Sequence, residues 1–323
     1  MQELLKIEDL QTHFFTHEGT VKAVNGVSFG INRGETLGIV GESGCGKSVT
    51  ALSIMRLIAD PPGKIVGGTI HFEEQNLLEL DERQMRDIRG RKISMIFQEP
   101  MTSLDPVFTI GHEIMETLQI HQKLDKSEAR RRAIEVLATV GIPDADKRVD
   151  SYPHELSGGM RQRAMIAMAL ACNPALLIAD EPTTALDVTI QAQILRLINE
   201  MKRTFDTSVL LITHDLGVIA EMSEHVAVMY AGHIVEYADV HTLFENPLHP
   251  YTKGLYRSIP RLDMEAERLD TIEGMVPNLI DLPAGCPYQN RCEYCFEPCL
   301  NEMPPLLPVA DKHLVKCHLY RGK

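Results

Sequence analysis

Residues 41–48 read Gly-Glu-Ser-Gly-Cys-Gly-Lys-Ser and match the phosphate-loop pattern G-x-x-x-x-G-K-[ST]. In such a loop the glycines let successive backbone N–H groups curl around an anion, and the following helix points its positive end at the phosphates. Lys47 supplies a positive charge for the β- and γ-phosphates, and the Ser48 hydroxyl is a hard oxygen ligand for Mg²⁺. The residues predicted to contact a nucleotide here are Gly41, Ser43, Gly44, Cys45, Gly46, Lys47, Ser48 and Val49.

The sequence around the loop has the order that a nucleotide site requires. The apolar run 34–40 predicts a strand that leads into the loop. Apolar residues at helical spacing from Ala51 to Ile58 predict a helix after it, which ends at Pro61-Pro62-Gly63. A glycine-rich turn without a ligand is the alternative, and the strand–loop–helix order favours the nucleotide site.

Strands and helices alternate along much of the chain. The predicted strands are 4–10, 27–31, 67–72, 92–97, 176–179 and 208–213, and the predicted helices include 159–171 and 188–204. This alternation predicts a mainly parallel α/β core. A stretch rich in Glu, Lys, Arg and Ala at helical spacing predicts a helical subdomain inserted at about 103–160. After residue 246 prolines gather and five of the seven cysteines appear, which predicts a separate, loop-rich appendage.

Bulk properties limit the class of protein. The chain has 323 residues and a net charge of −13, which argues against a general affinity for nucleic acid. No apolar run approaches the roughly 18–20 residues that span a bilayer. The N-terminus lacks the basic and apolar regions of a signal peptide. The sequence therefore predicts a cytosolic protein whose role at a membrane depends on a partner.

Two further motifs fit a nucleotide site. Asp180-Glu181 follow an apolar strand, where the first carboxylate can hold Mg²⁺ through water and the second can polarise an attacking water. A solvated loop end is the alternative, which the phosphate loop makes the weaker one. Ser157-Gly158-Gly159 begin a predicted helix and form a second anion site, although Ser157 can also be a plain N-cap. Two phosphate sites so far apart in sequence suggest that two chains share each nucleotide.

Together these motifs carry a family resemblance. One ordered set of motifs resembles the nucleotide-binding subunit of an ABC transporter, and the resemblance covers residues 1 to about 245. The set is GESGCGKS, Gln98, LSGGM, LLIADE, Ala185-Leu186-Asp187 and His214. The strings that resemble the peptide-importing branch are QEPMTSLDP at 98–106, YPHELSGGMRQR at 152–163 and NPLHPYTKGL at 246–255. The last contains His249-Pro250-Tyr251, which is typical of the C-terminal extension of oligopeptide and dipeptide importers. LSGGM, in place of the commoner LSGGQ, is similar to the D-type ATPase of those importers.

The resemblance implies a fold and a division of the chain. The expected fold is α/β: an ABC-type P-loop NTPase core with an inserted helical subdomain, an antiparallel β region and a small loop-rich C-terminal extension. The nucleotide-binding domain is expected at residues 1–245 and the extension, with the cysteine cluster, at residues 246–323.

The resemblance also implies a role for each motif residue. Lys47, Gln98, Glu181 and His214 form the catalytic set. Gln98 touches Mg²⁺, with Ser48 and Asp180, and senses the transmembrane subunit. Glu181 is the general base or orients the attacking water, and His214 contacts the γ-phosphate and holds that water.

Across the dimer interface, the resemblance implies that Ser157, Gly158 and Gly159 cap the γ-phosphate bound to the opposite subunit, and that Asp187 lies in the loop that crosses the interface. Phe14, with Phe15 second, is the aromatic expected to stack on adenine, and an ordinary core phenylalanine is the alternative for either. Cys45 stands where serine is common, and a small neutral residue contributing backbone N–H is the interpretation that we favour.

The C-terminal cysteines form a candidate metal site. Cys286, Cys292, Cys299 and Cys317 supply four soft ligands, but the spacing is a poor match for a zinc ribbon. Four thiolates suit an iron–sulfur cluster or Zn²⁺, while free thiols and disulfides are the alternatives. The resemblance implies a [4Fe–4S] cluster on these four residues, with Cys295 as a bystander and a structural rather than redox role.

The expected function is therefore that of an ATP-hydrolysing subunit that energises a membrane importer for di- and oligopeptides. The resemblance implies ATP and Mg²⁺ as cofactors and a position on the cytoplasmic face of the cell membrane. The expected partners are a second ATPase subunit, either identical or a paralogue, two transmembrane permease subunits and, through these, an extracytoplasmic substrate-binding protein. Nucleic acid is not expected to be a partner. The alternatives are an importer of nickel, haem or another solute, a non-transport ABC ATPase, and a nucleotide sensor without turnover. The single cassette without sustained heptads disfavours the second, and the presence of Glu181 and His214 disfavours the third.

Overall fold

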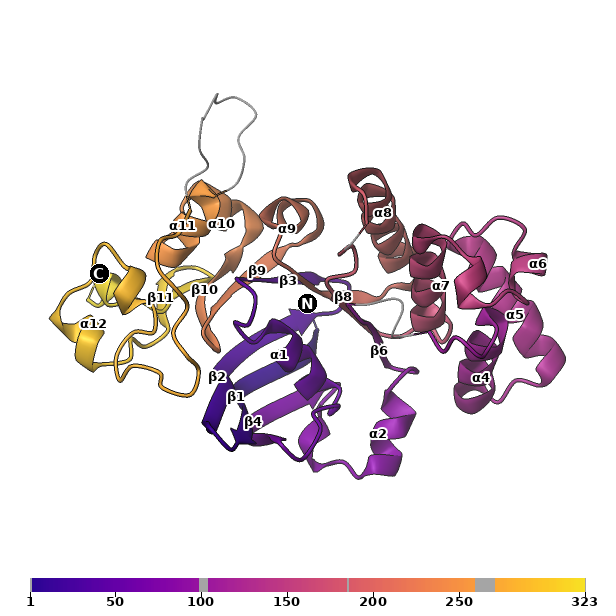
Figure 1. The fold of residues 1–323 in the computed structure, drawn as a ribbon, viewed down its shortest axis with the longest axis horizontal. Coiled ribbons are helices and arrows are strands. Elements are labelled where there is room, and N and C mark those ends of the chain that lie inside the picture. The colour runs from indigo at the N-terminus through magenta and orange to yellow at the C-terminus, as the bar shows by residue number, and fades with distance from the viewer. Residues whose placement is uncertain (1, 99–103, 185, 259–270, 323) are drawn as a thin grey trace. The chain divides into compact units, whose positions relative to one another are not determined.

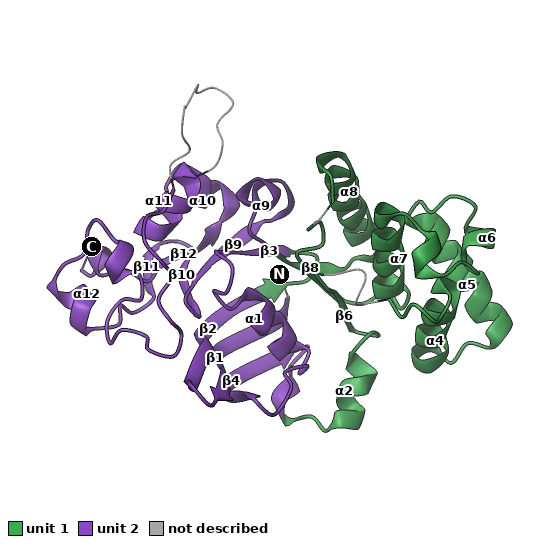
Figure 2. Cartoon of the chain, in the orientation of Figure 1, with its two compact units in different colours: residues 1–2, 31–35, 79–212 green, residues 3–30, 36–78, 213–323 purple. Residues whose placement is uncertain are grey.

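The computed structural model describes residues 2–98, 104–184, 186–258 and 271–322, and its ribbon is drawn in Figure 1 with elements labelled where there is room. The chain divides into two compact units. Residues 1–2, 31–35 and 79–212 form unit 1, and residues 3–30, 36–78 and 213–323 form unit 2 (Figure 2). Within the described ranges, no helix is both long and apolar enough to cross a membrane.

Unit 2 carries the strand that leads into the phosphate loop. This strand, β3 (Thr36–Val40), is buried at all five positions and runs parallel to β9 (His225–Tyr230). Burial on both faces explains why it is apolar throughout. β10 (His233–Asp239) pairs antiparallel with β9, and β12 (His313–Val315) and β11 (Leu307–Ala310) continue the order β11-β12-β10-β9-β3. The end of the chain thus adds strands to the sheet that holds the loop.

A second sheet of unit 2 is antiparallel, as expected for this fold. Its strands β1 (Glu3–Thr16), β2 (Gly19–Asn32), β4 (Gly63–Phe72) and β5 (Gln75–Asn76) lie in the order β2-β1-β4-β5. Apolar residues are paired across β1 and β4, for example Leu5 with Phe72 and Ile7 with Ile70, and all four are buried. The predicted strands 4–10, 27–31 and 67–72 are confirmed, each within a longer strand.

The predicted helix after the phosphate loop is too long. Helix α1 spans only Lys47–Ile54. Arg56 takes a left-handed φ of 50°, which a continuous helix does not allow, so Ile58 lies beyond the helix. The proline pair at 61–62 is therefore not what ends it.

Unit 1 contains parallel strands and a group of helices. Strands β6 (Ile93–Ile96), β7 (Leu176–Asp180) and β8 (Ser208–Thr213) lie in the order β8-β7-β6. Its helices are α2 (Glu82–Ile88), α4 (Ile110–Gln122), α5 (Lys126–Thr139), α6 (Ala145–Arg148), α7 (Gly158–Leu170) and α8 (Val188–Phe205). Helices α4, α5 and α7 pack against one another (Figure 2). The predicted strand at 208–213 and the helices near 159–171 and 188–204 are confirmed.

The remaining helices belong to the end of unit 2. They are α9 (Leu216–Met222), α10 (Val240–Glu245), α11 (Pro250–Arg257) and α12 (Glu297–Asn301), and short 3₁₀ turns occupy Leu77–Glu79, Pro153–Glu155, Gln289–Arg291 and His318–Tyr320 along the chain. Weak periodicity after residue 246 gave no sign of α11. That helix begins through its cap, because the His249 ring accepts a hydrogen bond from the Tyr251 N–H at 3.1 Å and Pro250 fits the first turn.

A buried carboxylate on β10 joins the extension to the sheet. Glu236 is 0% exposed and accepts hydrogen bonds from the backbone N–H groups of Leu248 (2.7 Å) and His249 (2.9 Å). The Nε2 atom of His313, on β12, lies 2.8 Å from the same carboxylate. One side chain therefore ties β10 to the start of α11 and to β12.

Replacing Glu236 with alanine should lower the free energy of unfolding by about 3–5 kcal/mol, because three buried donors lose their acceptor. Urea denaturation followed by circular dichroism measures the change. Glu302→Ala is the matched control, since the 2.9 Å Glu302–Arg321 pair has both side chains 61% exposed and should contribute at most about 1 kcal/mol. Equal losses in the two variants would contradict the role assigned to Glu236.

Candidate functional site

The phosphate loop lies between β3 and α1, as the sequence predicts. Its path requires glycine at two positions. A Cβ at Gly41 would lie 2.2 Å from the Met229 carbonyl oxygen, and a Cβ at Gly46, where φ is 107°, would lie 2.3 Å from the Ala23 carbonyl oxygen. The loop backbone is thus held against β9 and β2, and only glycine allows that approach.

Lys47 occupies the inner side of the loop. Its Nζ donates to the carbonyl oxygens of Gly41 (2.7 Å) and Glu42 (3.1 Å), and the side chain is buried. Of the other predicted contact residues, Ser43 and Gly44 are exposed, and Ser48 and Val49 are half-buried. The loop therefore holds a fixed cation and exposes its backbone at Ser43 and Gly44, which suits a polyanionic ligand.

Cys45 is buried beneath the loop, 3.8 Å from Lys47 Nζ. Burial raises the pKa of its thiol above the usual value, although the Lys47 charge opposes the shift. The residue therefore stays a neutral thiol at physiological pH, which agrees with the interpretation of Cys45 as a small neutral loop residue.

Phe14, Phe15 and His214 also lie in unit 2. The Phe14 ring is half-buried on β1 and packs over Gly63, where a Cβ would lie 2.8 Å from its Cε1. Phe15 is 53% exposed, so it presents more surface than Phe14 to a ligand. His214 directly follows β8 and is exposed, and the next residue, Asp215, caps α9 by accepting from the Gly217 N–H at 2.7 Å.

Unit 1 brings Gln98, Asp180 and Glu181 together. Asp180 ends β7 and is buried, and Glu181 follows it with a left-handed φ of 47° while its N–H donates to the Ile212 carbonyl at 2.9 Å. The Glu181 carboxylate accepts from the Gln98 amide at 3.2 Å and from the Thr184 hydroxyl at 2.9 Å. Sequence reasoning missed Thr184, although a hydroxyl three residues after the acid was a usable signal.

The serine–glycine motif begins α7. Ser157 caps the helix and accepts from the Met160 N–H at 3.3 Å, so its N-cap role is confirmed. A Cβ at Gly159 would lie 3.2 Å from Ile190, whose N–H donates to Asp187 at 3.0 Å. The motif and Asp187 therefore meet at the first turn of α8. Ala185 and residues 99–103 of the QEPMTSLDP string lie outside the described residues.

The predicted ligand cysteines lie close enough to affect one another. Burial raises the pKa of Cys286 to about 12 and that of Cys317 to about 11, and neighbouring thiols add to both shifts. The Cys286 N–H donates to the Cys299 carbonyl at 2.8 Å. Among the described residues, however, no group of three or more His, Cys, Asp or Glu side chains is arranged to hold a metal ion.

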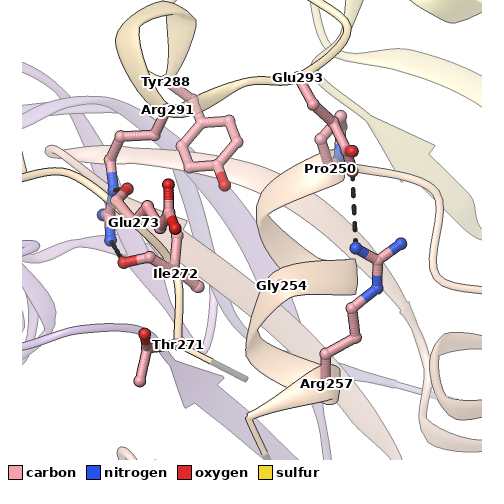
Figure 3. A pocket seen from close by; sticks show the side chains of 9 residues that line it. All are labelled: Pro250, Gly254, Arg257, Thr271, Ile272, Glu273, Tyr288, Arg291 and Glu293. Atoms are coloured by element: carbon pink, nitrogen blue, oxygen red, sulfur yellow. Dashed lines mark hydrogen bonds and ion pairs between the residues drawn. The ribbon is translucent and has the colours of Figure 1, made fainter. Parts of the chain in front are cut away.

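A pocket of about 310 Å³ lies beside α11 in unit 2. Arg291 and Arg257 stand on opposite sides of it, with the Tyr288 ring above, and Arg257 pairs with Glu293 at 3.5 Å (Figure 3). None of the site residues predicted from the sequence lines this pocket.

Comparisons with known proteins agree with the loop and the fold. A family model described as "ABC transporter" matches residues 24–184. The solved structure titled as the dimeric, post-hydrolysis state of the ATP-binding cassette MJ0796, bound to ADP and Pi, matches 73% of this chain and 99% of that chain, with a TM-score of 0.66 and 28% identity. The fold and the loop thus define an ABC-type ATPase cassette, and the expected fold class is confirmed.

The C-terminal part narrows the family. A model described as "Oligopeptide/dipeptide transporter, C-terminal region" matches residues 235–299. The probable peptide ABC transporter ATP-binding protein y4tR of Sinorhizobium fredii is 55% identical over 97% of this chain and 94% of its own length. The oligopeptide transport ATP-binding protein AppD of Bacillus subtilis is 52% identical over 99% and 98%. This chain belongs to the ATP-binding subunits of the oligopeptide and dipeptide ABC transporter family.

Replacing Gly46 with alanine should weaken ATP binding by at least about tenfold, because its φ alone costs a non-glycine residue about 1–3 kcal/mol and the new Cβ collides with the Ala23 carbonyl. Isothermal titration calorimetry with ATP measures the loss. Gly44→Ala is the matched control: its φ of 78° carries the same backbone cost, but a Cβ there would meet no described atom within 4 Å, so ATP binding should weaken less than in Gly46→Ala. A loss at Gly44 as large as that at Gly46 would show that the carbonyl contact is unimportant.

Proposed function

We propose that this chain hydrolyses ATP to drive a membrane importer of di- and oligopeptides, as one of two nucleotide-binding subunits. The observation that carries the proposal is a phosphate loop contacted directly by the His249-Pro250-Tyr251 extension: the Tyr251 hydroxyl accepts from the Glu42 N–H at 2.9 Å. Relatives that match this chain along nearly their whole length are named as ATP-binding proteins of peptide, oligopeptide and dipeptide transport. Import of another solute, such as nickel or haem, is the alternative.

The loop residues take the phosphate end of ATP. Lys47 is already held under the loop by two carbonyl oxygens, so its charge is in place before the nucleotide arrives. Ser48, Gln98 and Asp180 would hold Mg²⁺, which neutralises charge on the β- and γ-phosphates when bound. These oxygen donors are the kind that Mg²⁺ prefers. Phe14 or Phe15 stacks on the adenine.

Glu181 and His214 handle the attacking water. Glu181 orients it or takes its proton, and Thr184 and Gln98 hold the carboxylate in one orientation through their hydrogen bonds. His214 contacts the γ-phosphate. Because phosphoryl transfer needs placement and charge stabilisation more than covalent chemistry, these few groups suffice.

A second subunit completes each site through its Ser157-Gly158-Gly159 motif. Gly158 is exposed, and a Cβ there would meet no described atom of this chain within 4 Å. Packing among the described residues thus gives no reason for glycine at this position, whereas close approach to a partner's phosphates does. Asp187, beside the same turn of α8, lies in the loop that crosses the interface.

The remaining partners follow from the family. Two transmembrane permeases receive the motion of the ATPase pair, with Gln98 as the sensor at their contact, and a substrate-binding protein delivers peptide from outside. The chain would then be peripheral, on the cytoplasmic face of the membrane. Residues 1–245, with the helical subdomain at about 103–160, act as the motor, and residues 246–323 form the extension that marks the family.

Cys286, Cys292, Cys299 and Cys317 would hold a [4Fe–4S] cluster, with Zn²⁺ as the alternative. Three of the four are buried and Cys292 is half-buried. Among the described residues no group of three or more such side chains is arranged to hold a metal ion, so the choice of the cluster rests on the family resemblance and on the preference of four thiolates for iron–sulfur or zinc chemistry. The cluster would crosslink a segment that has little apolar core.

Glu181→Gln should bind ATP but turn it over at least about a hundredfold more slowly, because the amide cannot take the proton of the attacking water. Size-exclusion chromatography with ATP and Mg²⁺ should show a trapped dimer, and cells carrying the variant should lose uptake of a labelled dipeptide. Glu200→Gln, an exposed position on α8, should behave as wild type. Normal turnover in Glu181→Gln would refute the assignment, and retained peptide uptake in a null strain would refute the cargo.

Cys299→Ser should remove bound iron and acid-labile sulfide from anaerobically purified protein and lower its melting temperature, because a cluster ligand is lost. The control is Cys295→Ser, which should retain both. Zinc without iron would favour the alternative metal. If the wild-type protein contains neither iron nor zinc, the thiols are free.

A further inference from the structure

The phosphate loop contains an acidic residue where an anion must bind. Glu42 directly follows Gly41, and its side chain is 27% exposed. A carboxylate this close to the bound phosphates repels them unless another charge cancels it or holds it away. The structure provides a partner for the Glu42 side chain and another for its backbone N–H, and both come from the C-terminal extension.

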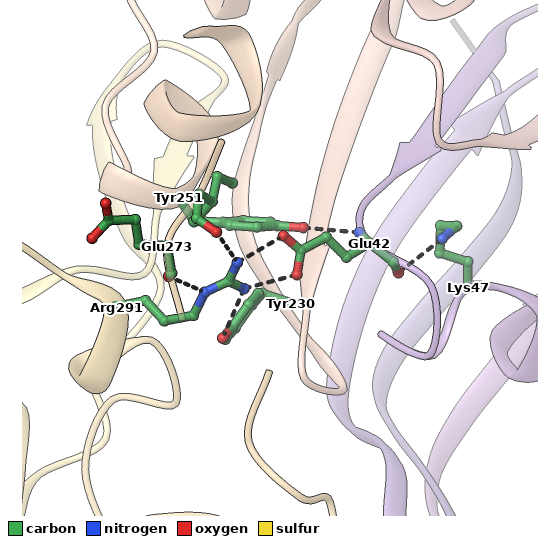
Figure 4. Close-up of polar contacts among 7 residues, drawn as sticks. Glu42, Lys47, Tyr230, Tyr251, Glu273 and Arg291 are labelled. Atoms are coloured by element: carbon green, nitrogen blue, oxygen red, sulfur yellow. Dashed lines mark hydrogen bonds and ion pairs between the residues drawn. The ribbon is translucent and has the colours of Figure 1, made fainter. Parts of the chain in front are cut away.

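The charge partner is Arg291. Its guanidinium donates to both Glu42 oxygens, at 2.8 and 3.1 Å, in a two-bond fork (Figure 4). The Arg291 side chain is only 4% exposed and is held further by the Glu273 carbonyl (3.0 Å) and the Ile272 carbonyl (3.1 Å). A forked, largely buried pair has a defined geometry, unlike a pair of surface charges.

The backbone partner is Tyr251. Its hydroxyl, fully buried, accepts from the Glu42 N–H at 2.9 Å. The rings of Tyr230, Tyr251 and Tyr288 pack together, with centroids 4.6 Å apart for the first two and 5.5 Å for the last two. The Arg291 guanidinium lies 5.8 Å from the Tyr230 ring centroid. The extension thus fixes both the main chain and the side chain of one loop residue.

We propose that Arg291 is a positioning residue for ATP: it cancels the Glu42 charge and holds that carboxylate away from the phosphates, so that the C-terminal extension sets the affinity of the loop for nucleotide. The inference rests on the proposed ATP site. It adds a charge requirement that the phosphate-loop pattern does not contain, because the second position of that pattern accepts any residue.

If Arg291 acts through its charge, the variants of Arg291 and Glu42 should show a different order of ATP affinities than if Arg291 only holds the structure together. Arg291→Ala leaves Glu42 uncompensated and should weaken ATP binding by about tenfold, or about 1.4 kcal/mol. Glu42→Gln leaves Arg291 uncompensated and should tighten binding. The double variant restores neutrality and should return close to wild type, within about threefold. If Arg291 only held the structure together, the double variant would bind ATP as weakly as Arg291→Ala.

The experiment measures ATP affinity of the full-length chain and these variants by isothermal titration calorimetry at low and high salt. At about 1 M salt the Debye length is about 3 Å, so the defect of Arg291→Ala should shrink. Arg291→Lys keeps the charge but loses the fork, so its ATP affinity should fall between those of the wild type and Arg291→Ala. Arg257→Ala is the matched control, because this arginine of the same pocket pairs with the exposed Glu293 and should leave ATP affinity unchanged.

Three results would overturn the inference: unchanged affinity in Arg291→Ala, no rescue by Glu42→Gln, or a defect insensitive to salt. Melting temperatures without nucleotide show whether each variant is folded, and Arg291→Lys decides the question if Arg291→Ala is not. Lys47→Ala separates this inference from the function itself. If the wild-type chain binds ATP no better than Lys47→Ala, the proposed ATP site is wrong. If the wild-type chain binds ATP and Arg291→Ala binds it equally well, only the role of Arg291 is refuted.

Discussion

The close passage of the phosphate loop against two strands is the constraint on which unit 2 depends. At Gly41 and Gly46 the loop backbone approaches the carbonyls of Met229 and Ala23 too closely for any side chain. This contact fixes the curvature of the loop, and the curvature places the Gly41 and Glu42 carbonyls where Lys47 can donate to both. A cation held by neutral carbonyls keeps its full charge for a ligand. The nucleotide site is therefore organised from beneath, by backbone packing, before any ligand binds.

The extension organises the same loop from its flank. Glu236 anchors the start of α11 through two buried backbone N–H groups, and α11 in turn carries Tyr251 to the Glu42 N–H. Arg291, further along the chain, closes on the Glu42 side chain. The extension and the loop fall within one compact unit. Loosening the buried anchor at Glu236 is thus expected to reach the loop, although the two are separated by some two hundred residues of sequence.

Much of this architecture could be predicted from sequence because it is local. The strand 208–213 was predicted to the residue, and the phosphate loop was placed correctly, because periodicity and motif spacing act over short distances. The helix after Lys47 was predicted too long, because apolar spacing continued past the left-handed Arg56. Arg291 could not be foreseen at all: it lies 249 residues from Glu42, and a single sequence contains nothing that links an arginine among cysteines to a distant loop.

The phosphate loop and the serine–glycine motif differ in what requires their glycines. Gly41 and Gly46 are required by carbonyls of this chain, so the loop would be conformationally complete in an isolated subunit. A Cβ at Gly158 would meet no described atom within 4 Å, and the Ser157 side chain caps α7, so packing among the described residues does not explain this glycine, in line with the partner-facing role proposed for the motif. Under the role proposed for Arg291, the extension sets from within unit 2 how tightly one subunit holds ATP, whereas the serine–glycine motif belongs to unit 1. Affinity and closure would then be set by separate parts of the molecule, which lets an ATPase bind nucleotide early and hydrolyse it only when paired.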